Sequence, residues 1–101
     1  MNAETADFII ADVVVPKAGR EAGKLYYVVA VEGDYILLAN GKDRSLEKPK
    51  RKKRKHAQKV LRSETRVAEK LRSGDKVLNS ELRRDLAYLS REMQSNNLGG
   101  F

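Results

Sequence analysis

Residues 12–31 read DVVVPKAGREAGKLYYVVAV, and the other predicted elements are arranged around them. A β-branched run reaches Pro16, a charged segment containing Gly19 and Gly23 follows, and a second β-branched run begins after it. Such runs are typical of strands, and glycines between them are typical of tight loops. The stretch therefore predicts two strands, residues 8–15 and 24–32, joined by a tight loop.

Further turn signals follow downstream. Gly33-Asp34 is expected to reverse the chain into a third strand, residues 35–39, and Asn40-Gly41 to reverse it again into a short polar strand, residues 42–46. Residues 56–61 are apolar enough to form a closing strand. The first strand is apolar toward both faces, which predicts burial on both sides. Successive antiparallel hairpins favour a meander that curls into a small barrel.

The end of the chain has a helical pattern. Residues 63–72 carry an apolar patch and precede Gly74, which predicts a short helix that ends there. Asn79 or Ser80 is a plausible N-cap for a second helix, with Glu81 near its positive end. One helical stripe in that segment consists of Leu82, Leu86, Leu89 and Met93. We expect the stripe to pack against the rest of the fold, the alternative being a docking face for a protein partner.

A chain of 101 residues with 41% hydrophobic residues is long enough for one compact domain. It lacks an apolar run of the roughly 18–20 residues that span a bilayer. Residues 1–7 carry two acids and no Lys or Arg, unlike a secretory signal, and cysteine is absent. We therefore expect a cytoplasmic protein. The predicted domain organisation is a flexible N-terminus (1–7), a β-barrel (8–61) with a basic loop (48–55), a helical extension (62–94) and a flexible tail (95–101).

The net charge of +7 is unevenly distributed. Residues 1–47 have a net charge of −3, residues 48–72 of +10, and residues 73–101 of zero. Residues 48–55 contain seven basic residues in eight, and their mutual repulsion predicts an extended loop. A localised basic block is typical of a protein that binds a polyanion, and it would contact phosphates without reading bases. Alternatives are a solvated loop without a partner and a nuclear import signal, which is compatible with RNA binding.

The residue types needed for catalysis are scarce. The chain has one histidine, no cysteine and no paired carboxylates in an apolar setting, and its glycines match no phosphate-binding or dinucleotide-binding loop. We expect neither an enzyme nor a metal or cofactor. Aromatic side chains can stack with unpaired bases. For Tyr26, Tyr27 and Tyr35, however, a place in the core is the preferred interpretation.

Four segments together resemble a known family: residues 18–24 (AGREAGK), 32–35 (EGDY), 40–42 (NGK) and the basic run 48–56. With them, residues 7–59 resemble the KOW-domain RNA-binding proteins related to the ribosomal protein L14e/L6e/L27e family. The resemblance implies a small SH3-like barrel, here followed by two short helices, that binds RNA and associates with the ribosome. Residues 73–84 depart from the family core and are only loosely similar to the tails of bacterial stand-alone members. This favours a free-standing RNA-binding protein over a constitutive ribosomal subunit.

The sequence therefore predicts a mainly β protein of the translation apparatus that binds structured RNA, expected to be ribosomal RNA. The competing hypothesis is a protein-interaction module, such as a transcription-elongation partner, that uses the barrel and the leucine stripe. Gly19 and Gly23 are expected to shape the first loop. The expected RNA-binding residues are Lys17, Arg20, Lys24, Lys48, Lys50, Arg51, Lys52, Lys53, Arg54, Lys55 and His56.

Overall fold

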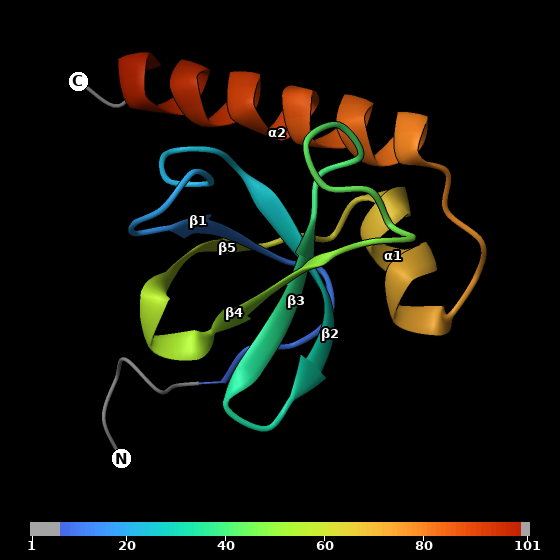
Figure 1. Ribbon diagram of the computed structural model, residues 1–101. Coiled ribbons are helices and arrows are strands. Elements are labelled where there is room, and N and C mark those ends of the chain that lie inside the picture. The colour runs from blue at the N-terminus through green and yellow to red at the C-terminus, as the bar shows by residue number, and fades with distance from the viewer. Residues whose placement is uncertain (1–6, 100–101) are drawn as a thin grey trace.

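The computed structural model describes residues 7–99, as a five-stranded antiparallel sheet followed by two helices (Figure 1). Residues 1–6 of the expected flexible N-terminus (1–7) and residues 100–101 of the expected flexible tail (95–101) lie outside the described part. The side chains of residues 96–99 are likewise not described. The elements are β1 (Asp12–Pro16), β2 (Tyr26–Glu32), β3 (Tyr35–Ala39), β4 (Lys50–Lys53), the 3-10 helix η2 (Arg54–His56), β5 (Ala57–Arg62), α1 (Arg66–Ser73) and α2 (Asn79–Gly99).

The strands lie in the order β4-β3-β2-β1-β5, so the two edge strands are β4 and β5. These edges are consecutive in the chain, and the three residues of η2 connect them. A connection this short requires the ends of the two edge strands to lie near one another, which curls the sheet. The expected antiparallel meander is confirmed for β1, β2 and β3.

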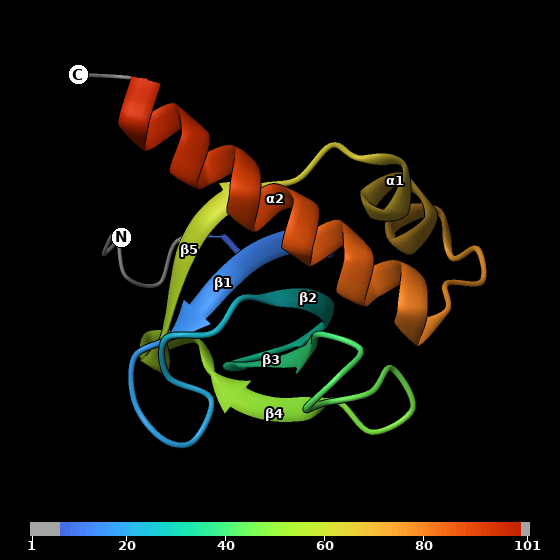
Figure 2. The same cartoon turned by 90° about the horizontal axis from the view of Figure 1, so that it is seen from above.

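Both faces of β1 are buried, as its sequence predicts. Val13 belongs to an apolar cluster beneath α2, whereas Val14 belongs to a second cluster that contains Phe8, Tyr26 and Ile36. Neighbouring residues of a strand point to opposite faces, so the two valines enter separate cores. One of these cores is formed by the sheet and the helices together, because α2 runs across the strands (Figure 2).

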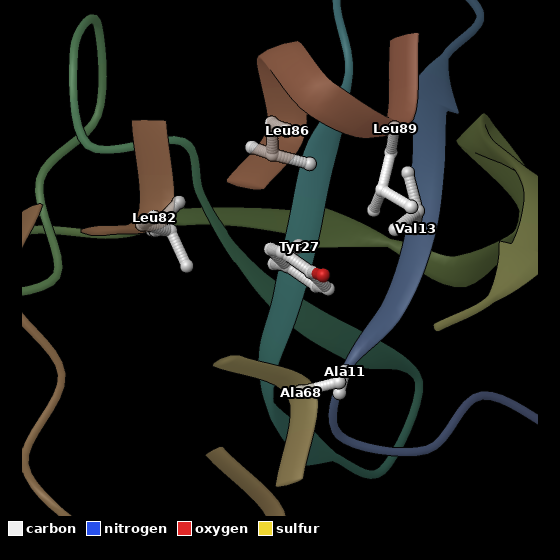
Figure 3. Packing of buried hydrophobic residues seen from close by; sticks show 8 residues of the cluster. Ala11, Val13, Tyr27, Ala68, Leu82, Leu86 and Leu89 are labelled. Carbon is white, nitrogen blue, oxygen red and sulfur yellow. The ribbon is translucent and has the colours of Figure 1, made fainter. Parts of the chain in front are cut away.

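The leucine stripe of α2 packs against the sheet. Leu82, Leu86 and Leu89 point toward Tyr27 and Val13 (Figure 3), and each leucine is at most 8% exposed. The expectation that the stripe packs within the fold is therefore confirmed for the three leucines, whereas its fourth member, Met93, is partly exposed. Because these leucines are covered, they offer no docking face to a partner.

Tyr27 joins three parts of the molecule through its buried hydroxyl group. The hydroxyl donates its single proton to the Asp85 carboxylate, and its oxygen also lies within hydrogen-bond distance of Ser63 Oγ at 2.8 Å and of Thr65 Oγ1 at 3.3 Å. Thr65 Oγ1 in turn donates to Asp85 Oδ2 at 2.8 Å and accepts from the Ala68 amide at the start of α1. Burial and then the Asp85 hydrogen bond raise the pKa of Tyr27 to about 12, so the hydroxyl keeps its proton and remains a donor.

The buried carboxylate of Asp12 joins β1 to β5 through ion pairs with two basic residues of β5. This carboxylate is fully buried and accepts from Arg62 Nε at 2.9 Å, with Lys59 Nζ at 3.3 Å. The Ile9 amide also donates to it, at 2.9 Å. A buried carboxylate needs partners of this kind, since an unpaired charge in the interior costs several kcal/mol. These contacts explain why a charged residue, Asp12, can stand within the otherwise apolar residues 8–15.

Several predicted boundaries are wrong, each for an identifiable reason. The first strand begins at Asp12 instead of Phe8, because residues 9–12 form a turn. No strand forms at residues 42–46, where the Asn40 side chain instead accepts from the amides of Lys42 and Arg44 and closes a turn. The helix α2 continues to Gly99, so residues 95–99 are not a loose tail. None of the helices among residues 7–99 is both long and apolar enough to cross a membrane.

Gly41 lies where the β3–β4 connection passes closest to α2. Its φ of +78° is in the left-handed region, and a Cβ atom placed on it would lie 2.2 Å from the Asn79 carbonyl oxygen. The Gly41 carbonyl also accepts from Arg83 Nη1 at 2.8 Å, and Asn79 Oδ1 accepts from the Leu46 amide at 2.8 Å. The prediction that Asn79 or Ser80 caps the helix is wrong, because Asn79 is already the first helical residue and its side chain bonds to this connection.

The substitution Gly41→Ala should be far more destabilising than Gly23→Ala. Gly23 has a similar φ of +82° but open space around it, so Gly23→Ala should cost only the backbone strain of about 1–2 kcal/mol. Gly41→Ala adds a backbone clash and should cost at least about 2 kcal/mol more. Urea unfolding of both variants measures the difference, and equal losses would show that the helix does not press on Gly41.

Candidate nucleic-acid interface

Most of the basic block is a strand and a helical turn, so the prediction of a loop over residues 48–55 is wrong from Lys50 onward. Lys50–Lys53 forms β4, which pairs with β3 in the register Leu38↔Lys50 to Tyr35↔Lys53. Residues 54–56 form η2. The repulsion between cations predicts an extended backbone, and β3 supplies the ladder that this backbone joins. Pairing with β3 thus fixes the position of residues for which the sequence predicts an extended loop.

The alternation of β4 divides the block between two faces. Lys50 and Lys52 share a face with the buried side chains of Ile36 and Leu38, and both lysines are partly buried. Long lysine stems can cover apolar surface while their charged ends reach water. Arg51 and Lys53 lie on the other face and are exposed.

Glu21 neutralises part of the block. Its side chain is 8% exposed and contacts Lys52 Nζ at 3.3 Å and Arg44 Nη2 at 3.2 Å. Burial alone would raise the pKa of Glu21, but the hydrogen bonds from Arg44 and Lys52 hold it below its usual value. The carboxylate is therefore ionised at neutral pH and holds Lys52, whose side chain is only 14% exposed. Glu21, which in the sequence only dilutes the charge of its loop, is a structural partner of β4.

The loop between β1 and β2 lies beside this strand, as the expected site requires. The Lys17 amide donates to the His56 carbonyl at 2.9 Å, which joins the start of the loop to η2. A Cβ atom on Gly19 would lie 3.5 Å from Lys52 Nζ, and both Gly19 and Gly23 have positive φ. Lys17 and Arg20 are exposed, whereas Lys24 pairs with Asp43 at 3.2 Å.

The expected RNA-binding residues therefore fall into two groups. Four are already engaged: Lys24 with Asp43, Lys52 with Glu21, Arg54, whose Nε donates to the Gly33 carbonyl at 2.7 Å, and Arg51. Arg51 is exposed, but it lies over the Tyr35 ring and its Nε is 3.8 Å from the Glu32 carboxylate. Among residues 7–99 no carboxylate pairs with the side chains of Lys17, Arg20, Lys48, Lys50, Lys53 or Lys55. His56 is exposed beside Lys55.

Tyr26, Tyr27 and Tyr35 differ in whether an RNA base could reach their rings. Tyr26 and Tyr27 are both fully buried, as the preferred interpretation of a core role implies. Tyr35 is only partly buried and carries the Arg51 guanidinium 3.7 Å from its ring centroid. The sequence gives no direct signal for this contact, because it depends on the register of a strand that reads as a loop.

Neither the models of known protein families nor the curated proteins contain a significant match to this chain. The resemblance to KOW-domain proteins therefore stays a prediction.

Lys52 and Lys53 are adjacent residues of one type with opposite surroundings, and their alanine variants should differ. Lys52→Ala leaves the buried Glu21 carboxylate with one partner and should lower the free energy of unfolding by about 2 kcal/mol. Lys53→Ala removes an exposed side chain without an ion pair and should change it by less than about 0.5 kcal/mol. Urea unfolding at neutral pH measures both values. A loss for Lys53→Ala as large as that for Lys52→Ala would contradict this division of the strand.

Proposed function

We propose that this protein binds structured RNA, specifically ribosomal RNA, and works in the translation apparatus. The observation that carries the proposal is a set of lysines on or beside β4 and η2 that have no ion pair among residues 7–99: Lys48, Lys50, Lys53 and Lys55. These elements are fixed at both ends by the sheet, so the cations have defined positions. Phosphate contacts from such lysines supply affinity for RNA and a strong dependence on salt.

The curled sheet supports the finer fold assignment. In our proposal the sheet closes as a small SH3-like barrel of KOW type, with η2 joining its two edge strands. The loop between β1 and β2 then lies beside the basic strand and adds Lys17 and Arg20 to the same surface. This arrangement agrees with the resemblance of residues 7–59 to KOW-domain proteins of the ribosomal family.

The charge distribution also favours RNA over a protein partner. The segment 48–72 carries a net charge of +10, whereas the rest of the chain has a net charge of −3. A polyanion matches a concentrated charge of this kind. The competing hypothesis of a protein-interaction module uses the leucine stripe as a docking face. The leucines of the stripe are covered by the sheet and are not accessible to a partner.

Removing Lys53 and Lys55 together should weaken RNA binding and reduce its salt dependence. The slope of log affinity against log salt should become shallower by about one for each lysine that contacts phosphate. The control is the double variant Lys76→Ala and Arg91→Ala, which removes the same charge from exposed positions outside the basic segment. Fluorescence anisotropy with a ribosomal RNA fragment measures both slopes. If the two double variants changed RNA binding and its salt dependence equally, the interaction would depend only on the net charge of the protein and not on the position of Lys53 and Lys55.

In cells, the protein should sediment with ribosomes at low salt and be released at high salt. Ultraviolet crosslinking followed by RNA sequencing should place it at one ribosomal RNA site, and the Lys53→Ala, Lys55→Ala variant should lose these crosslinks. If the protein stayed in the soluble fraction and crosslinked to scattered transcripts, the proposed role in translation would be wrong. RNA binding itself would still be supported.

A further inference from the structure

Tyr35 and Arg51 form a stacked pair on the exposed face of β3 and β4. Arg51 lies across the ladder from Leu37 and reaches diagonally to Tyr35, with its guanidinium 3.7 Å from the ring centroid. The Glu32 carboxylate, which stands opposite Tyr35 on β2, lies 3.8 Å from Arg51 Nε. Two neighbours therefore orient the guanidinium, while more than half of the Arg51 side chain stays exposed.

A pocket of about 270 Å³ opens next to this pair, lined by Asp34, Tyr35, Lys53, Arg54 and Lys55. Its two sides are tied together, because the Arg54 amide donates to the Asp34 carbonyl at 2.9 Å and Arg54 Nε donates to the Gly33 carbonyl at 2.7 Å. The β2–β3 turn and η2 are thus held at a fixed separation. In Figure 1 the β2–β3 turn lies at the bottom of the sheet, and α2 runs along the top. The helix therefore leaves the pocket uncovered.

The lining residues combine three chemical features. Tyr35 offers an aromatic surface, Lys53 and Lys55 are exposed cations, and Asp34 is an exposed carboxylate without an ion pair among residues 7–99. A phosphate group alone would be repelled by Asp34 and would gain nothing from the ring. A nucleotide would use all three features, because its base can stack and donate an N–H while its phosphates meet the lysines.

We propose that this pocket binds one unpaired RNA base, an inference that rests on the RNA-binding function proposed above. The base extends the stack of Arg51 and Tyr35, and the flanking phosphates bind Lys53 and Lys55. The Asp34 carboxylate accepts from the amino group of the base, as carboxylates do from cytosine. Uracil has no amino group and binds less well. The substrate class is therefore RNA with an unpaired base, in a loop, a bulge or a single strand, and not a continuous duplex.

The test measures the affinity of the full chain for oligocytidine, oligouridine and an RNA duplex of the same length. Tyr35→Ala should weaken oligocytidine binding roughly tenfold to a hundredfold and leave duplex binding within about twofold. Tyr35→Phe, which keeps the ring, should bind like the wild type. Tyr88→Ala removes an exposed tyrosine of α2 that lies outside the pocket and should have no effect. The salt dependence should stay unchanged in all three, because none alters a charge.

Two further variants test the roles of Arg51 and Asp34. Arg51→Lys keeps the charge but removes the planar group, so it should weaken oligocytidine binding several-fold without affecting the duplex. Asp34→Ala should abolish the preference for oligocytidine over oligouridine. A urea unfolding curve for each variant separates a folded protein with lost affinity from an unfolded one, and Arg51→Lys keeps the test valid if Tyr35→Ala does not fold.

An equal loss for oligocytidine and duplex in Tyr35→Ala would overturn the base site, as would no loss in either. Salt-sensitive RNA binding that does not depend on Tyr35 would contradict the proposed base site only, and the proposed phosphate interface would still stand. If the wild type binds none of the three RNAs, both proposals are wrong. The two failures are thus distinguishable in one set of measurements.

Discussion

The buried hydroxyl group of Tyr27 is the contact on which the arrangement of sheet and helices depends. It bonds to Ser63 and Thr65, where the chain leaves β5, and to Asp85 in the second turn of α2. Thr65 also caps α1, so the same cluster fixes the start of one helix and the second turn of the next. A buried polar network is favourable only when its members are all satisfied, and this one specifies a single position for α2. The leucine stripe supplies apolar burial, but apolar contacts alone would tolerate a shifted helix.

The position of α2 controls the basic strand through the connection between β3 and β4. The first turn of the helix meets that connection at Gly41 and Leu46, and the connection leads directly into β4. From the other side, Glu21 in the loop before β2 contacts Lys52. The helix therefore holds the connection that leads into β4, and the Glu21 carboxylate holds the strand itself at Lys52. Its cations occupy defined positions, even though their mutual repulsion opposes a compact arrangement.

The sequence predicts the elements whose pattern is local. The β-branched runs identify β1 and β2, the leucine spacing identifies the buried face of α2, and Gly74 ends α1 in the left-handed conformation that the pattern predicts. The errors arise where a partner distant in the sequence decides the outcome. Residues 50–53 become a strand because β3 offers its edge, and Asn40-Gly41 begins a long connection because α2 lies against it. The pairs Glu21–Lys52 and Tyr35–Arg51 depend on this tertiary arrangement, so the sequence alone could not place them.

Fixed cations have a different value for binding than mobile ones. A free lysine-rich loop loses conformational freedom when it binds RNA, and this loss opposes the favourable contacts with phosphate. On β4 and η2 the backbone is already ordered, so only the lysine side chains have to become ordered on binding. The strand also sets the spacing, because alternate residues point to one face. Arg51 and Lys53 are therefore presented together on the face that bears Tyr35, whereas Lys52 is retained by Glu21. Secondary structure in the basic segment thus turns a general attraction for polyanions into a surface with a defined geometry.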